Sequence, residues 1–332
     1  MMHFGKHYAH INNYKAVYNM RFRCVLPIVF FLNCFISAAS FAVEEASDQP
    51  ATLIEPTVGS WTFSGVVSNE SGDRYGYFFQ ILRQGDDFHA KTALIDGQTN
   101  QLILFYENDA KIVGTTSLDW HVGRSFIRYN PINESWIFGI KEVDKKGFNF
   151  KVDMLKQENN DDEVVELRPG LHWLALQTSS LNGHIETGEE SKEAFVIGST
   201  AWFGKLWVSI DQQATHAIST TYCRLSDENG FYSANLKETD ATQAAVTGWR
   251  DATGNKVKMS QFISIATLAD NQSLLSVGVP KLNLKLTNAL SNIPVDPASG
   301  NQPDLTLAGF SQESKGFCFV TEQVFLKANP VS

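Results

Sequence analysis

The chain has 332 residues, of which 43% are hydrophobic and 12% aromatic, and its formal net charge is −9. This composition excludes a mainly disordered protein, and the length allows about two domains. The negative charge argues against nucleic acid and anionic membrane surfaces as partners, because both select basic proteins.

The N-terminal segment has the pattern of a secretory signal peptide. After Met20, two arginines precede an apolar run, Val25–Ile36, and small residues follow up to Ala42. The apolar run is shorter than the roughly 20 residues of a membrane-spanning helix. We therefore expect residues 1–42 to be a signal, with Met20 as an alternative start, and the mature protein to be exported to the periplasm or secreted. Removing this segment takes away four basic residues and no acidic one, so the net charge becomes −13.

Beyond a linker over residues 43–57, short alternating apolar runs separated by Gly, Asp and Asn predict an all-β protein. Only two segments, Asp240–Val246 and Asp270–Leu275, show a weak helical period. The predicted strands are Trp61–Val67, Tyr75–Arg83, Phe88–Ile95, Gln101–Tyr106, Ser125–Tyr129, Ser135–Val143, Phe148–Leu155, His172–Thr178, Phe195–Ser199, Lys205–Ile210, Ile218–Leu225, Val257–Ser264, Lys281–Thr287, Leu305–Ser311 and Gly316–Phe325.

A weak internal repeat suggests two similar β-domains. Residues 66–79 resemble residues 223–236, and the turn within 93–102 resembles the one within 248–257. Two domains, 58–206 and 207–328, would explain the repeat. The alternative is that β-hairpins of similar composition look alike.

The mature chain keeps two cysteines, Cys223 and Cys318, because Cys24 and Cys34 lie in the predicted signal. In an oxidising compartment the two thiols can pair, or both can stay as buried thiols. The sequence leaves both alternatives open.

Motifs of common active sites are missing from the sequence. It has no nucleophile elbow, phosphate loop, dinucleotide fingerprint or zinc-protease motif, and we expect neither a cofactor nor a metal. His184 and Glu186 lie two residues apart on one strand face, which predicts an exposed pair rather than a metal site.

Aromatic side chains are dense in the predicted strands. Strand alternation places Tyr75, Tyr77 and Phe79 on one face, where they either fill a barrel or line a ligand cavity. Polar groups in the same strands favour a cavity. The expected contacts of a ligand are Trp61, Tyr75, Tyr77, Phe79, Arg83, Trp120, Trp136 and Trp202.

The order of several motifs resembles one family. WTFSG, GDRYGYFFQILR and FHAKTALID are followed by ESWIFGI, SSLNGHIETG, VIGSTAWFGKLW and KGFCFVTEQVF, and together they span about residues 58–326. This series is similar to the AttH/CrtC-like family, which includes carotenoid 1,2-hydratase. The resemblance implies two tandem lipocalin-like antiparallel β-barrels with an apolar ligand site and, in some members, addition of water to an isoprenoid double bond.

The chain departs from the family pattern at two acidic positions, which are Ser60 and Gly204 here. Asp96, Asp119 and Glu322 are the remaining candidate acids, and His89 and His121 are the candidate bases. We therefore expect an exported protein that binds a hydrophobic small molecule, such as a lipid or an isoprenoid, and that meets membranes only by proximity. A hydratase or isomerase using acid catalysis, and a non-catalytic interaction module of the cell envelope, are the alternatives.

Overall fold

The structure, a computed structural model, describes most of the chain after Glu55. The described residues lie in one compact unit, Gln49–Ser332. The predicted signal peptide and most of the linker lie outside them. The described ranges are 56–114, 118–154, 164–178, 180–188, 193–199, 201–209, 216–225, 229–238, 241–251, 256–269, 271–291, 293, 305–311 and 316–325.

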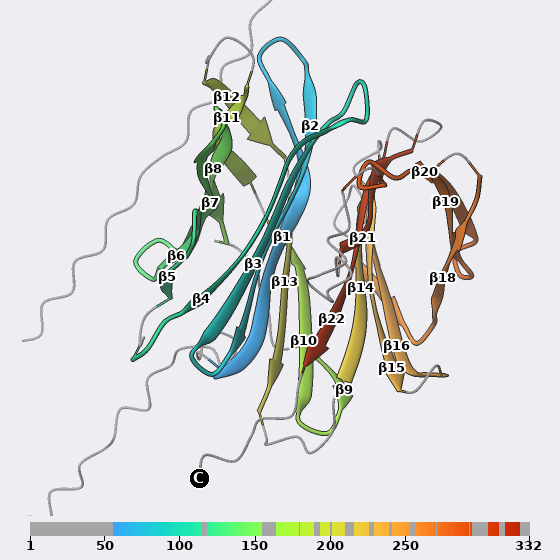
Figure 1. The fold of residues 1–332 in the computed structure, drawn as a ribbon. Coiled ribbons are helices and arrows are strands. Elements are labelled where there is room, and N and C mark those ends of the chain that lie inside the picture. Colours follow the sequence, from blue (N-terminus) through green and yellow to red (C-terminus); the bar gives the residue numbers. More distant parts are fainter. Residues whose placement is uncertain are drawn as a thin grey trace, which may run out of the picture. The chain divides into compact units, whose positions relative to one another are not determined.

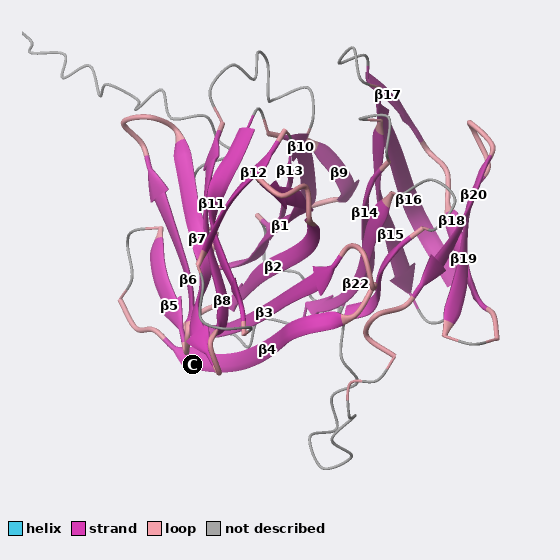
Figure 2. Ribbon diagram, turned by 90° about the horizontal axis from the view of Figure 1, so that it is seen from above, coloured by secondary structure: helices cyan, strands magenta, loops and turns pink. Residues whose placement is uncertain are grey.

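The described part of the chain is all-β, as the sequence predicts. It contains 22 strands, and Figure 2 shows strands and loops with no helix among these residues. Accordingly, no described segment forms a helix long and apolar enough to cross a membrane.

The first barrel is built around the long strand β1 (Figure 1). Its strands run in the order β4-β3-β2-β1-β12-β11-β8-β7-β6-β5, and all neighbours pair antiparallel. β1 forks at one edge: Gly59–Gly65 pair with β13, whereas Ser68 and Asn69 pair with β12. Beyond β13 the same sheet continues through β10 to β9. The strands are β1 (Val58–Asn69), β2 (Arg74–Gln84), β3 (Asp87–Asp96), β4 (Leu102–Lys111), β5 (Asp119–Val122), β6 (Ser125–Asn130), β7 (Ser135–Val143), β8 (Lys146–Asp153), β9 (Val165–Arg168), β10 (Leu171–Gln177), β11 (Ser180–Thr187), β12 (Ala194–Gly198) and β13 (Ala201–Val208).

The second barrel combines two smaller sheets. One has the order β17-β16-β15-β14-β22-β21, the other the order β18-β19-β20, and a bridge between Leu286 and Ser311 joins them. The strands are β14 (His216–Arg224), β15 (Gly230–Glu238), β16 (Ala241–Arg250), β17 (Lys256–Met259), β18 (Ile263–Thr267), β19 (Gln272–Val277), β20 (Leu282–Thr287), β21 (Leu305–Phe310) and β22 (Phe317–Phe325).

The internal repeat corresponds to matching strands. Residues 66–79 span the turn between β1 and β2, and residues 223–236 span the turn between β14 and β15. The second pair of turns joins β3 to β4 and β16 to β17. The tandem arrangement is therefore confirmed, while the domain bounds 58–206 and 207–328 stay a proposal.

Three of the predicted elements are wrong. Val257–Ser264 is not one strand but contains parts of β17 and β18, separated by three residues. The two segments with a weak helical period, Asp240–Val246 and Asp270–Leu275, lie largely in β16 and β19. Pairing with neighbouring strands outweighs weak local helix preference in both.

The two barrels contact each other through apolar outer faces. Trp173, Trp202 and Leu206 of the first sheet pack with Tyr222 and Tyr232 of the second. A further cluster joins the outer faces of β2 and β3 to those of β21 and β22, and it includes Phe78, Ile95, Phe310, Phe317 and Phe319. These contacts decide which faces of β14, β15 and β22 are left to line the second barrel.

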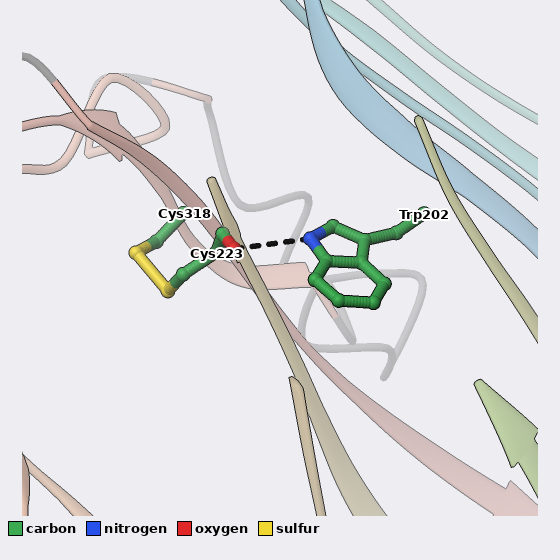
Figure 3. Close-up of a disulfide and its surroundings, with 3 residues drawn as sticks. All are labelled: Trp202, Cys223 and Cys318. Atoms are coloured by element: carbon green, nitrogen blue, oxygen red, sulfur yellow. Dashed lines mark hydrogen bonds between the residues drawn. A yellow bond between two sulfur atoms is a disulfide. The ribbon is translucent and has the colours of Figure 1, made fainter. Parts of the chain in front are cut away.

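Cys223 and Cys318 form a disulfide, which settles the alternative that the sequence left open. They are directly opposite each other on β14 and β22 and are fully buried. The indole N–H of Trp202, on β13 of the first sheet, donates a hydrogen bond to the Cys223 carbonyl on β14, at 3.0 Å (Figure 3). The disulfide and this hydrogen bond tie the second barrel internally and to the first sheet.

Replacing both cysteines with alanine should lower the free energy of unfolding. The disulfide joins residues 95 apart in the sequence, and a disulfide typically contributes about 2–4 kcal/mol, with long loops toward or above the upper end of that range. Urea unfolding of the wild type with and without reductant is the control, because reduction keeps both sulfur atoms. Equal unfolding midpoints for the oxidised and reduced wild type would contradict the prediction.

Candidate functional site

The interior of the first barrel is crowded with aromatic rings. Trp61 and Trp120 lie edge to face with their ring centroids 4.7 Å apart. Phe63 stacks on Phe138 at 4.1 Å, and Tyr77 lies edge to face with Phe150 at 4.9 Å. Such pairs add about 0.5–1.5 kcal/mol each beyond the burial of their surface. Tyr77 and its neighbours thus meet other rings directly.

Most of the expected ligand contacts lie in this aromatic core. Arg83 is buried at its edge, with the guanidinium 5.4 Å from the ring centre of Phe88 and 5.7 Å from that of Trp120. Trp202 lies on the opposite face of the sheet, against the second barrel. The assignment of these residues to ligand binding stays a prediction. Those within the core are Trp61, Tyr77, Phe79, Trp120 and Trp136, and the partly buried Tyr75 packs against them.

Three of the candidate acids and bases lie at the surface of the first barrel. The Asp96 carboxylate accepts hydrogen bonds from the backbone N–H groups of Gln98 and Thr99, at 2.8 and 2.7 Å, and so closes the turn between β3 and β4. Asp119 and His121 lie two residues apart, on the exposed face of β5. Asp119 binds Arg128 at 2.9 Å, and His121 lies 3.9 Å from the same carboxylate. The structure brings Asp119 and His121 together, but outside the barrel.

His89 lies between two carboxylates on the outer face of β3 and β4. Its Nδ1 is 2.6 Å from Asp109, and its Nε2 is 2.9 Å from Glu107. The Lys91 ammonium, which is buried, is 3.3 Å from Glu107. Partial burial and Lys91 disfavour a charged imidazole, but the two carboxylates outweigh them and raise the pKa of His89. The same contacts lower the pKa of Glu107.

A cavity of about 410 Å³ lies inside the second barrel. Its size is within the range of small-molecule sites. Strand alternation builds it: Ser219 of β14, Asn235 of β15 and Glu322 of β22 are cross-strand neighbours that face inward together. The lining residues are Ser219, Asn235, Lys237, Ile263, Ile265, Thr267, Asn271, Gln272, Ser273, Asn288, Ser291, Thr306, Leu307, Val320 and Glu322.

The cavity lining combines polar and apolar side chains. Ile263, Ile265, Leu307 and Val320 are its apolar part, and all of them except Ile265 belong to the buried cluster that contains the disulfide. Asn235 is nearly buried, and its amide donates to the Ile263 carbonyl at 3.4 Å. Such a lining suits a ligand that has an apolar part and several hydrogen-bonding groups.

One ion pair neutralises the charged groups of the cavity. The Lys237 ammonium lies 2.7 Å from the Glu322 carboxylate, and both side chains are 44% exposed. A pair this exposed adds little stability, so both groups can exchange partners for a ligand. Among the described residues, no group of three or more His, Cys, Asp or Glu side chains could hold a metal ion.

Of the candidate acids and bases, Glu322 lines this cavity, whereas sequence reasoning did not identify Asn235 or Lys237. Both lie on β15, where the sequence GFYSANLKE alternates polar and apolar residues. Such alternation is usually interpreted as a solvated outer face and an apolar interior. Here the apolar Tyr232 and Leu236 face the first barrel, so the polar residues face the interior. The alternation in β15 was thus visible in the sequence, but which of its two faces points into the barrel depends on the contacts between the barrels.

Comparisons with known proteins support the tandem fold. No family model matches the chain, and no curated protein matches it. A crystal structure of a protein assigned as AttH from Nitrosomonas europaea superimposes with a TM-score of 0.55 at 15% identity, covering 80% of this chain and 92% of that one. Kievitone hydratase from Nectria haematococca gives a TM-score of 0.56 at 11% identity, covering 84% and 92%. This chain has their fold. These superpositions confirm the resemblance inferred from the motifs as a shared fold.

The two positions where the family pattern has acids are buried between the barrels. Ser60 is fully buried on β1, and Gly204 pairs with Thr62 in the centre of β13. A Cβ atom added at Gly204 would lie 1.9 Å from the Tyr222 hydroxyl oxygen. Burial raises the pKa of Tyr222 to about 12, which keeps the phenol neutral. The Tyr222 ring thus occupies the space into which a longer side chain at position 204 would extend.

Gly204→Ala should destabilise the protein by about 1–3 kcal/mol, because the new methyl group overpacks a buried site. In a Tyr222→Leu background the same change should cost less, since the clashing hydroxyl is gone. Urea unfolding of the four proteins forms a double-mutant cycle. Strictly additive costs would show that Tyr222 does not limit this position.

His89→Gln should reduce stability more at pH 6 than at pH 8.5. The folded-state pKa of His89 is raised, so its stabilisation is fully present below the unfolded pKa of about 6.5 and is lost as pH rises through the folded value. Urea unfolding of wild type and variant at both pH values measures this, with His121→Gln as the control for loss of a histidine. A difference between wild type and His89→Gln that stays constant with pH would contradict it.

Proposed function

We propose that the second barrel binds a small molecule that carries both an apolar part and hydrogen-bonding groups. The observation that supports this is the cavity, with Ile263, Ile265 and Leu307 beside Ser219 and Asn235. The cavity favours a ligand with polar groups over the purely hydrophobic ligand expected from sequence, because polar side chains make up much of its lining. Export of the protein remains part of the proposal and is supported by the pattern of residues 20–42.

The ligand in this proposal makes two kinds of contact. Its apolar part lies against the isoleucines of β18 and gains about 25 cal/mol per Å² of buried surface. Its polar groups bond to Ser219, Asn235 and the Lys237–Glu322 pair. A cavity that presents hydrogen-bonding groups discriminates strongly against ligands that leave them unpaired. Selectivity therefore comes from the polar side and affinity mostly from the apolar side.

Filling the cavity should abolish most binding. Thr267 lines it and is exposed, so Thr267→Trp adds volume without disturbing a packed core. We expect binding of dansylaminoundecanoic acid, followed by dansyl fluorescence, to weaken at least about tenfold, or about 1.4 kcal/mol. Ala266→Trp is the matched control. The Ala266 side chain is next to Thr267 in the sequence and also exposed, but it points to the opposite face of β18, away from the cavity. Equal binding by the two variants would refute the proposed site.

Acid-catalysed hydration is the second candidate function, favoured by one observation. In its carboxylic acid form, the Glu322 side chain in the cavity would give its proton to one carbon of a ligand double bond, while water adds to the other carbon and returns a proton to the resulting carboxylate. Kievitone hydratase, which shares the fold, is a hydratase by name.

Mass spectrometry of unsaturated isoprenoids and lipids incubated with the protein in ¹⁸O-labelled water separates the two functions. An enzyme would give labelled, hydrated product that Glu322→Gln abolishes while probe binding persists. Absence of labelled product across the panel would leave binding as the function.

A further inference from the structure

The interior of the second barrel changes from apolar to polar along the strands. β14 and β22 pair in register, so their inward residues form successive rows across the two strands. The disulfide between Cys223 and Cys318 forms one row, and Val320 lies in the next. The row after that is polar and joins Ser219 to Glu322. The apolar end of the cavity therefore lies toward the disulfide, and its polar end lies away from it.

The cavity opens at its polar end. Ile263, which belongs to the buried cluster that contains the disulfide, is 7% exposed. Two residues further along β18, Ile265 is 39% exposed, and Thr267 beyond it is exposed as well. The side chains of Lys237 and Glu322 are both 44% exposed. Solvent therefore reaches the cavity from the side of Thr267 and of the ion pair.

Two buried hydroxyl groups face the cavity from different strands. Ser219 of β14 and Ser273 of β19 both line it, and each residue is only 8% exposed. Neither hydroxyl makes a hydrogen bond within the described part of the chain. A buried polar group without a partner costs free energy, and a hydroxyl can both donate and accept. A ligand whose own hydroxyls reach Ser219 and Ser273 would satisfy both groups.

The other polar groups at this end carry no net charge. Asn271 and Gln272 contribute carboxamides, which also donate and accept. The Lys237 ammonium and the Glu322 carboxylate neutralise each other. An anionic ligand that took Lys237 would leave Glu322 without its counter-ion, and a cationic ligand that took Glu322 would do the same to Lys237. Two hydroxyls of one ligand avoid this cost, because one accepts from the ammonium while the other donates to the carboxylate.

We propose that the polar end of the cavity binds an uncharged head group with several hydroxyls, and that the ligand is an alkyl glycoside or a similar polyol with one hydrocarbon tail. This rests on the proposed function of the cavity and names the class of its ligand. The head bonds to Ser219, Ser273 and the Lys237–Glu322 pair. The tail lies against Val320 and points toward the disulfide.

Titration of the full chain with three ligands of equal tail length, followed by saturation-transfer difference NMR, tests the class of ligand. Octyl β-glucoside should bind about twofold to fivefold more tightly than octanoate or octylammonium at pH 7, because a half-exposed ion pair sets a modest preference. The terminal methyl protons should receive more saturation than the sugar protons, since the tail is the buried end. Equal or tighter binding of either ion, or stronger saturation of the sugar, would overturn the proposal.

Removing one member of the ion pair should change which head group is preferred. Glu322→Gln leaves the Lys237 ammonium without its counter-ion, so octanoate should bind about twofold to fivefold more tightly than it binds to the wild type. Lys237→Gln should give the same gain for octylammonium. A gain in binding cannot come from a misfolded variant. Lys285→Gln, on the exposed face of β20, is the control and should keep the wild-type order. An unchanged order in both ion-pair variants contradicts the role given to the pair.

The Thr267→Trp variant separates failure of this proposal from failure of the cavity as a site. If it weakens binding of the octyl ligands while an ion binds best to the wild type, the cavity stands and the uncharged head is wrong. If it weakens none of the ligands that bind, the cavity is not their site and both proposals fail. No saturation transfer to any octyl ligand, with dansylaminoundecanoic acid still bound, overturns the alkyl polyol alone.

Discussion

The apolar contact between the outer faces of the two barrels determines how the rest of this protein is built. Tyr222, Tyr232 and Leu236 pack against Trp173, Trp202 and Leu206 of the first sheet. Because side chains alternate along a strand, placing the apolar residues of β14 and β15 outward leaves Ser219 and Asn235 to face inward. The second barrel thus has a partly polar interior, which an isolated barrel with a solvated outer face would lack.

The first barrel shows the opposite balance. Its inward residues are large and aromatic, and rings such as Phe63 and Phe138 are in direct contact. Removing one ring from such a core typically costs 3–5 kcal/mol, because the surroundings relax only partly. The second barrel lines its cavity with aliphatic and polar side chains and no aromatic ring. The two similar barrels therefore differ inside: the first has a packed aromatic core and the second has a cavity.

The all-β class and the tandem repeat could be predicted from sequence, because turn residues and alternation recur in both halves. The strand within Asp240–Val246 could not be predicted, because this alanine-rich segment forms a strand only through its pairing with β15. Aromatic density around Tyr77 indicated a special region but could not separate a filled core from a cavity. Glu322 could be proposed as a site residue because it lies in the KGFCFVTEQVF motif near the end of the motif series. Asn235 was not, because the direction in which β15 faces depends on contacts with Trp173 and Trp202, which are distant in the sequence.

The most direct measurement is a crystal structure of the protein with dansylaminoundecanoic acid bound. Ligand density in the second-barrel cavity, between Asn235 and Ile265, is the predicted result. Density among Trp61, Trp120 and Phe88 of the first barrel, with the second-barrel cavity empty, would contradict the central claim that the second barrel is the binding domain.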